Sequence, residues 1–179
     1  KTVEKNLSIL QKVEKDTGCK ILLAQKAFSC FYEYPLIGQY ISGTTASGLF
    51  EARLGKEEMG KENMIAPAYK EEDVKELVKS ANHMVFNSFA AGKYKLSDKK
   101  PSVGIDINPE CSTQEDHAIY DPCAKGSRLG VTIAHFKEQF TDEMYDYVDG
   151  LHFHTLCEQN ADDLENLEAV EENSAVILQ

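Results

Sequence analysis

The sequence lacks several features that define large classes of proteins. No apolar run approaches the roughly 20 residues of a membrane-spanning helix, and the opening KTVEKNLSIL has the pattern of a charged amphipathic helix, not of a signal peptide. Basic residues are few, with 19 Lys and Arg against 30 Asp and Glu. The resulting net charge of −11 opposes binding to a nucleic-acid backbone or an anionic membrane. We therefore expect neither a nucleic acid nor a membrane as partner.

Familiar cysteine and glycine motifs are absent as well. The five cysteines (Cys19, Cys30, Cys111, Cys123 and Cys157) include no CxxC pair. This dispersed, odd set without a signal peptide indicates reduced thiols, so we expect a cytoplasmic protein. Neither GxGxxG nor the phosphate-loop motif GxxxxGK[ST] occurs, which weakens the case for a doubly wound nucleotide-binding fold.

The residues that are present are typical of a soluble globular protein, with 42% hydrophobic and 27% charged side chains. A chain of 179 residues is long enough for one domain with a substantial core, so we predict a single domain over 1–179. The chain already opens in a helical pattern, and we expect the natural protein to begin upstream.

Short apolar runs alternate with longer amphipathic stretches along the chain. The runs predict strands at 20–28, 40–46, 63–68, 83–87, 103–108 and 150–156. The stretches predict helices at 3–15, 48–58, 71–80, 89–96, 134–148 and 161–172. This alternation predicts an α/β fold with a parallel sheet and right-handed crossovers. Gly18 follows the first helix, where a left-handed cap is expected.

The number of strand–helix units favours an incomplete TIM-type barrel. Six are present, whereas a closed (β/α)8 barrel needs eight and about 250 residues. A long irregular segment at 109–131 follows the fifth strand, at the end where barrel enzymes build their active sites. We therefore predict about three quarters of a barrel, with open edges.

Lys26 lies near the carboxyl end of the first predicted strand, on the face of Leu22, Ala24 and Phe28. Burying a lysine in a barrel is costly, and burial lowers the pKa of its amine. A neutral amine is a nucleophile toward an aldehyde, which makes Lys26 a candidate for holding a cofactor. The alternative, that Lys26 ends the strand and reaches solvent, stays open.

His152 and His154 share one face of the last predicted strand. Their rings suit stacking on an aromatic cofactor, zinc ligation or hydrogen bonds within the core, and spacing alone leaves all three open. Cys157 and Glu158 follow at the same strand end, and Cys157 is more simply a small buried residue than a nucleophile.

Other candidates carry weaker signals. Ser47 and Gly48 follow a strand and suit either an anion site or an ordinary helix N-cap. Arg128, in the segment SRLG, is by itself typical of a structural or surface arginine. Three further histidines have no partner at metal-ligand spacing, and we predict no metal site; they are His83, His117 and His135.

Five segments together have a more specific pattern: AQKAF, SGTTASGLFEA, INPE, HAIYDPCAKGSRLG and GLHFHTLCEQNADDLE. They resemble the carboxynorspermidine (carboxyspermidine) decarboxylases, which belong to the alanine-racemase-like group of pyridoxal-phosphate (PLP) enzymes. The resemblance runs from about Val3 to about Val170. The fourth and fifth segments are the most specific to this family.

The resemblance implies a function and a set of roles. Lys26 matches the lysine that binds PLP covalently, His154 the histidine that stacks on the pyridine ring, and Arg128 a basic residue near the subunit interface. The implied reaction removes the α-carboxylate of carboxynorspermidine or carboxyspermidine, giving norspermidine or spermidine in polyamine biosynthesis. The implied architecture is a PLP-binding barrel followed by a β domain, in a homodimer.

The sequence also departs from this family. Asp106 stands where relatives usually carry arginine, and the tail NSAVILQ has no counterpart. The Gly-rich phosphate loop and the β domain do not follow within the 179 residues, so we expect this N-terminal portion to be inactive alone. The alternatives are a non-catalytic single-barrel PLP protein, a decarboxylase of the same group that acts on diaminopimelate, ornithine or arginine, and a metal-dependent barrel hydrolase using His152 and His154.

Overall fold

The computed structural model describes residues 2–67, 70–89, 101–111 and 121–155. The chain divides into two compact units, Lys1–Met84 with Leu96–Ser102, and Val85–Lys95 with Val103–Gln179. Most of the predicted helix 89–96 and all of the predicted helix 161–172 lie outside the described residues.

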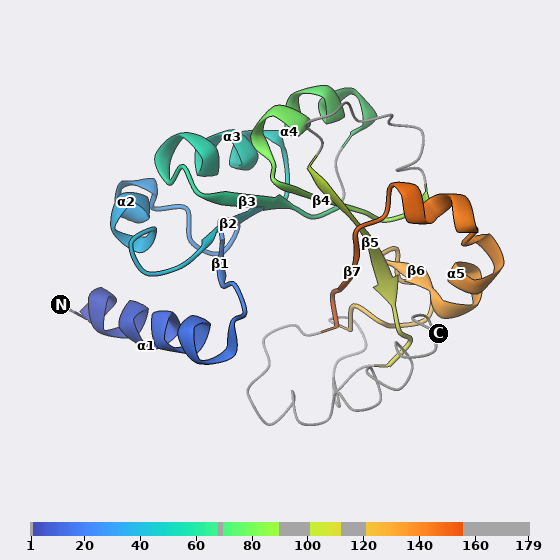
Figure 1. The fold of residues 1–179 in the computed structure, drawn as a ribbon, viewed down its shortest axis with the longest axis horizontal. Helices are drawn as coiled ribbons and strands as arrows, with labels where there is room; N and C mark the ends of the chain where they lie inside the picture. Colours follow the sequence, from blue (N-terminus) through green and yellow to red (C-terminus); the bar gives the residue numbers. More distant parts are fainter. Residues whose placement is uncertain (1, 68–69, 90–100, 112–120, 156–179) are drawn as a thin grey trace. The chain divides into compact units, whose positions relative to one another are not determined.

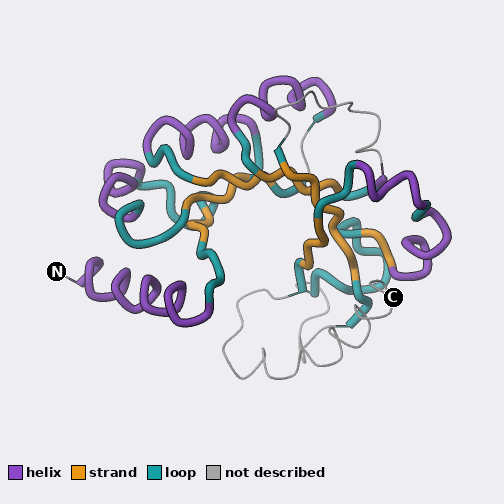
Figure 2. Tube along the Cα trace, viewed as in Figure 1, coloured by secondary structure: helices purple, strands orange, loops and turns teal. Residues whose placement is uncertain are grey.

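In the first unit, helices alternate with parallel strands as predicted (Figures 1 and 2). Its α-helices are α1 (Thr2–Thr17), α2 (Tyr34–Ile37), α3 (Leu49–Glu58) and α4 (Val74–Ser80), with 3-10 helices η1 (Phe31–Glu33) and η2 (Glu71–Asp73). Its strands are β1 (Leu22–Ala24), β2 (Gly43–Ala46), β3 (Glu62–Ile65) and the first half of β4 (His83–Phe86). Neighbouring strands pair in parallel in the order β1-β2-β3-β4.

The first helix is fixed to the sheet at its carboxyl end. Gly18 ends α1 with a φ of 75°, as predicted, and its N–H donates to the carbonyl of Glu14 at 2.9 Å. The Glu14 carboxylate accepts hydrogen bonds from the backbone N–H groups of Ile21 at 2.6 Å and Ser42 at 3.1 Å. One side chain therefore satisfies the backbone just before β1 and β2.

The face of the sheet beneath α3 carries buried polar side chains. The Thr44 hydroxyl donates to Oδ1 of Asn63 at 3.1 Å, and Nδ2 of Asn63 donates to the carbonyl of Ala52 in α3 at 2.6 Å. A methyl group on Gly55 would lie 2.3 Å from Oγ1 of Thr44 and 2.9 Å from Nε2 of Gln25. Glycine at this position thus lets α3 approach the sheet closely.

Several predicted boundaries in the first unit are wrong. The strand predicted over 20–28 ends at Ala24, because residues 25–27 form a turn. The strand predicted from Tyr40 begins only at Gly43, since the N–H groups of Tyr40 and Ile41 both donate back to the carbonyl of Ile37. The short helices η1 and α2 were not predicted from the sequence.

The second unit contains the end of β4, most of β5 (Ser102–Asn108), β6 (Val131–Thr132), α5 (Ile133–Gln139), the 3-10 helix η4 (Asp142–Asp146) and β7 (Gly150–Phe153). Both β6 and β7 pair in parallel with β5. The single helix predicted over 134–148 is wrong. Phe140 adopts an extended conformation at the end of α5, where its ring stacks on Phe136 at 4.7 Å and meets Tyr145 edge-on at 5.0 Å.

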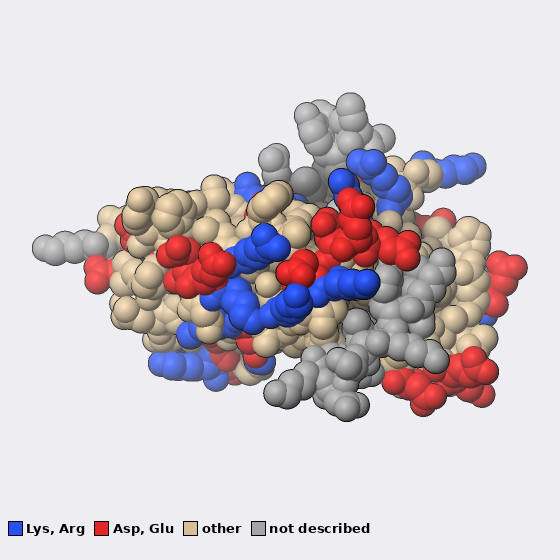
Figure 3. All heavy atoms as spheres, turned by 90° about the horizontal axis from the view of Figure 1, so that it is seen from above, with Lys and Arg blue, Asp and Glu red and all other residues tan. Residues whose placement is uncertain are grey.

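The six predicted strands are all present, and every recorded strand pair is parallel, which confirms the α/β class. The single domain over 1–179 stays a prediction. None of the helices in the described part of the chain combines the length and apolar composition needed to cross a bilayer. Acidic side chains lie beside basic ones on the face shown in Figure 3, and Arg53 of α3 pairs with Glu76 of α4 at 3.6 Å.

Candidate active site

Lys26 follows the carboxyl end of β1 on an exposed turn. The N–H groups of Ala27 and Phe28 donate to the carbonyl of Ala24 at 3.0 and 3.2 Å, and these bonds close the turn. The prediction that Lys26 lies on the strand face with Leu22, Ala24 and Phe28 is therefore wrong. Among the described residues Lys26 has no hydrogen-bond or ion-pair partner, so its amine stays free for a reactant.

The carboxyl end of β2 carries the Ser47–Gly48 pair. Gly48 is the N-cap of α3, and the Glu51 carboxylate accepts the backbone N–H of Ser47 at 2.6 Å. A carboxylate of the chain itself thus occupies the start of this helix, which favours the N-cap interpretation over an anion site.

Asp106 and His152 form a hydrogen-bonded polar pair in the described part of the second unit. The register of β5 and β7 places them as direct partners, and Oδ1 of Asp106 lies 2.8 Å from Nδ1 of His152. Asp106 is 1% exposed, whereas the His152 side chain is 21% exposed. An acid at this position is therefore accommodated by a hydrogen-bonded imidazole. Sequence reasoning singled out both residues but did not pair them.

His154 lies just beyond the carboxyl end of β7, and its ring centroid is 6.4 Å from that of His152 at an interplanar angle of 44°. The two histidines were predicted to share one face of the last strand, but β7 ends at Phe153, so only His152 lies on the strand. Within the described ranges, no three His, Cys, Asp or Glu side chains are grouped as a metal site would require. Cys157 and Glu158 lie outside the described residues.

The SRLG segment docks on the ends of β4 and β5. Nδ2 of Asn87 donates to the carbonyl of Arg128, and Oδ1 of Asn87 accepts the N–H of Gly130 at 2.6 Å. Gly130 has a φ of 79°, and a methyl group there would lie 2.5 Å from the backbone nitrogen of Asn108. The backbone of Arg128 is thus held while its side chain is exposed. Nothing in the sequence pattern pointed to Asn87.

Of the two cysteines that the structure describes in this unit, Cys123 is buried and Cys111 is partly exposed. Burial, reinforced by the charges of Asp121, Cys111 and Asp106, raises the pKa of Cys123 to about 11. The thiol is therefore protonated at neutral pH and serves as a small packing residue.

Of the other histidines, His83 bonds to Ser102 at 2.5 Å, His135 lies on α5, and His117 is outside the described residues.

No family model matches the chain. The chain is 38% identical over 165 residues to a carboxynorspermidine/carboxyspermidine decarboxylase of Campylobacter jejuni, covering 91% of this chain and 42% of that protein. It is 35% identical over 162 residues to a carboxyaminopropylagmatine decarboxylase of Synechocystis sp., covering 88% of this chain and 41% of that protein.

The fold of the chain is also similar to that of a solved structure. The crystal structure of carboxynorspermidine decarboxylase from Campylobacter jejuni, complexed with norspermidine, matches with a TM-score of 0.82 and 35% identity. The match covers 98% of this chain and 44% of that one, so the chain spans less than half the length of these relatives. In sequence and in fold, the chain is similar to the carboxynorspermidine/carboxyspermidine decarboxylases over this part of their length.

Proposed function

We propose that the chain is part of a PLP-dependent decarboxylase acting on a carboxylated polyamine, with carboxynorspermidine and carboxyspermidine as first candidates. The observation that carries the proposal is the 38% identity to an enzyme of that name over 91% of the chain. The product norspermidine is bound in the solved relative, which supports a polyamine-type ligand.

Each unit offers one described side chain of a type that the cofactor uses. Lys26 offers an exposed primary amine at the carboxyl end of β1, which is the group that PLP needs for covalent attachment. His154 offers a flat imidazole suited to the pyridine ring, at the carboxyl end of β7. When bound, the protonated cofactor ring supplies an acceptor for the electron pair left by the departing carboxylate.

The other residues support this assignment in less direct ways. Asp106 fixes the orientation of the His152 ring through the bond to Nδ1, and the carbonyl and amide bonds of Asn87 hold the segment that contains Arg128. We assign Arg128 to the neighbourhood of a subunit interface in a cytoplasmic homodimer. In this proposal, catalytic turnover also requires a region equivalent to the part of the relatives that the 179 residues do not match.

A second substrate has specific support. The relative from Synechocystis sp. is named for carboxyaminopropylagmatine, and its 35% identity is close to the 38% of the first relative. The two candidate reactions are therefore compared directly. A non-catalytic PLP protein would take up the cofactor and decarboxylate neither substrate.

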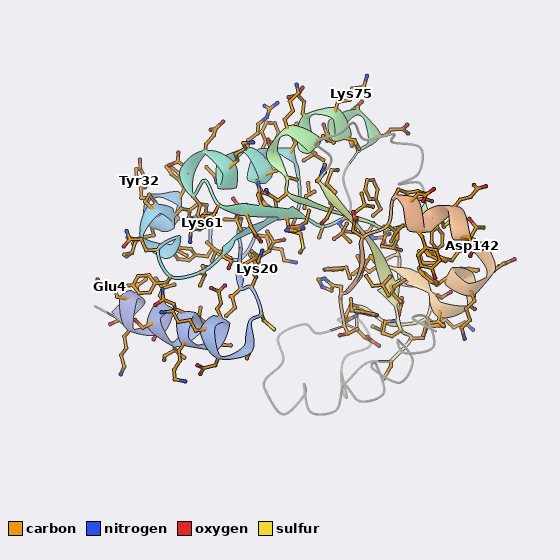
Figure 4. All side chains as sticks on the ribbon, in the orientation of Figure 1. Glu4, Lys20, Tyr32, Lys61, Lys75 and Asp142 are labelled. Carbon is orange, nitrogen blue, oxygen red and sulfur yellow. The ribbon has the colours of Figure 1, made fainter. Side chains whose placement is uncertain are left out.

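The test begins with the absorbance spectrum of the 179-residue chain mixed with PLP, before and after borohydride reduction, followed by mapping of the modified peptide. If the gene encodes a longer chain, that chain is measured in parallel. Lys26→Ala removes the proposed attachment point. Lys20→Ala is the matched control, because Lys20 lies before β1 at the other end of the same strand, paired with Glu62 (Figure 4).

We expect the cofactor on Lys26 in the wild-type and Lys20→Ala chains and no specific attachment in Lys26→Ala. Release of CO2 from carboxynorspermidine, carboxyspermidine and carboxyaminopropylagmatine then identifies the substrate. PLP bound with no CO2 from any of the three would favour the non-catalytic alternative. Cofactor spread over many lysines, in both chain lengths, would contradict the proposal.

A further inference from the structure

The turn that carries Lys26 is tied to one buried tyrosine. Tyr34, the first residue of α2, is 0% exposed. Its hydroxyl lies 3.2 Å from the carbonyl oxygen of Phe28 and 3.5 Å from Oε1 of Gln25. Gln25 and Phe28 lie on either side of Lys26 in the chain, so a single phenol reaches both sides of the turn.

A phenol donates only one proton, which decides between the two oxygens. The carbonyl of Phe28 is nearer and accepts the hydrogen bond, while Oε1 of Gln25 is at the limit of hydrogen-bond distance. Gln25 has its own anchor, because its backbone N–H donates to the carbonyl of Thr45 in β2 at 3.2 Å. The entry to the turn is thus held by β2, and its exit is held by Tyr34.

The position of this hydroxyl is itself fixed by packing. The Tyr34 ring belongs to a buried cluster with Leu7, Ile37 and Ile41, so the ring has little freedom to move. Burial, with smaller contributions from the charges of Glu51 and Cys30, raises the pKa of Tyr34. The phenol therefore remains a neutral hydrogen-bond donor under ordinary conditions.

The rest of the turn has few anchors of this kind. Residues 26–30 are all exposed. The described bonds of this stretch other than the one to Tyr34 are local backbone bonds: the Ala27 and Phe28 amides donate to Ala24, and the carbonyls of Ser29 and Cys30 accept from residues 31 and 33. Removing the Tyr34 hydroxyl leaves the Phe28 carbonyl to solvent and frees the exit of the turn. A displacement of about 1 Å at a reacting group is enough to slow a reaction substantially.

We propose that Tyr34 is a positioning residue for Lys26, holding the exit of its turn through the hydrogen bond to the Phe28 carbonyl. This inference rests on the proposed function, in which the Lys26 amine attaches to PLP. It adds a residue from α2 that contributes no atom to the reaction and determines how well the amine is placed.

Tyr34→Phe removes only the hydroxyl and keeps the ring in its cluster. Ile41→Val is the matched control, because it weakens the same cluster and leaves the hydroxyl bridge intact. The first readout is hydrogen exchange at the amides of Ala27 and Phe28. One hydrogen bond is worth about 0.5–1.5 kcal/mol, so we expect exchange there to accelerate roughly two- to twelvefold in Tyr34→Phe, beyond any global change. Ile41→Val should show only the global change.

The second readout is the rate at which PLP becomes attached to Lys26, measured by borohydride trapping in whichever chain length takes up the cofactor. We expect Tyr34→Phe to lower this rate several-fold and Ile41→Val to leave it unchanged at equal folded fraction. Exchange equal to that of the control would overturn the inference, and so would faster exchange with an unchanged attachment rate. If the wild-type chain does not attach PLP at Lys26, the proposed function is wrong, and this result is obtained before any variant is measured. If the wild type attaches PLP and Tyr34→Phe behaves like the control, only the inference about Tyr34 is wrong.

Discussion

Asp106 and His152 are partners on adjacent parallel strands, joined by a 2.8 Å hydrogen bond from Nδ1 of the imidazole to Oδ1 of the acid. A carboxylate accepts hydrogen bonds, which gives Nδ1 of His152 the role of donor in this pair. The position at which relatives are expected to carry arginine is therefore filled by an acid with a specific partner. This arrangement makes the pair a defined target for substitution.

Asp106→Ala should destabilise the second unit by about 1–3 kcal/mol, because it leaves Nδ1 of a half-buried imidazole without its acceptor. Asp106→Asn keeps an oxygen at the same place and should cost less than half as much. The measurement is urea unfolding at pH 7. The control is His135→Ala on the exposed surface of α5. Equal losses for the Ala and Asn variants would show that the hydrogen bond is not what stabilises this site.

Gly130→Ala should be much more destabilising than Gly126→Ala. Both glycines have positive φ, 79° and 83°, so each alanine bears a conformational cost of about 1–2 kcal/mol. At Gly130 the added methyl group also lies 2.5 Å from the nitrogen of Asn108, whereas at Gly126 it meets no described atom within 4 Å. We expect a further loss of about 1–3 kcal/mol at Gly130 from this overlap. Comparable unfolding midpoints for the two variants would contradict the close approach of SRLG to β5.

Glu14 should make stability depend on pH in the acid range. Burial tends to raise the pKa of Glu14, but hydrogen bonds from Ile21 and Ser42 outweigh it and lower the pKa from the ordinary value of 4.5. A carboxyl group whose pKa is lowered in the folded state contributes its full stabilisation of the fold at pH values above its pKa in the unfolded chain. The stabilisation is lost as the pH falls through the lower, folded-state pKa.

Glu14→Gln should therefore be less stable than wild type at pH 7, and the difference should shrink steadily as the pH falls below about 4.5. Urea unfolding at several pH values between 3 and 7 measures the difference. Glu57→Gln, an exposed carboxylate on α3, controls for the change in net charge. A difference between Glu14→Gln and wild type that stays constant over this range would argue against a charged Glu14 as the anchor of α1.

The cysteines should react in two groups. With a pKa of about 11, Cys123 is thiolate in only about one molecule in a thousand at pH 8, and it is also buried. Cys19 and Cys30 are exposed. Iodoacetamide at pH 8, followed by peptide mass spectrometry, should therefore modify Cys19 and Cys30 well before Cys123. Rapid modification of Cys123 in the folded chain would contradict the packing around it.

Six of the strands were readable from the sequence, because buried parallel strands such as MVF in β4 and VGIDIN in β5 are short apolar runs between longer amphipathic stretches. The position at which β1 ends could not be predicted from the sequence. The turn at residues 25–27 depends on a bond to Thr45 and on the Tyr34 hydroxyl, which are distant contacts without a local signature. The break of the 134–148 helix at Phe140 likewise comes with aromatic contacts to Phe136 and Tyr145.

The candidate site was predictable in its residue types and less so in its connections. His152 and His154 stand out in the sequence because alternation predicts one shared strand face for them, although β7 ends at Phe153. Their relation to Asp106 follows only from the β5–β7 register, which neither strand encodes alone. Asn87 carried no signal, because an asparagine after a strand is common and its two bonds to SRLG span more than 40 residues. Lys26 was singled out by resemblance and retains that role as a proposal.

The division of the chain has a practical consequence for dissecting it. The first unit comprises Lys1–Met84 and Leu96–Ser102, so the backbone leaves it within β4, returns, and leaves again within β5. No single cut of the gene yields either unit intact. Any cut either falls within a strand or leaves one segment of a unit on the fragment that carries the other unit. Complementation between two co-expressed fragments is thus a more informative experiment than expression of either half. Joining the discontinuous pieces of one unit with a designed linker would be the corresponding engineering route.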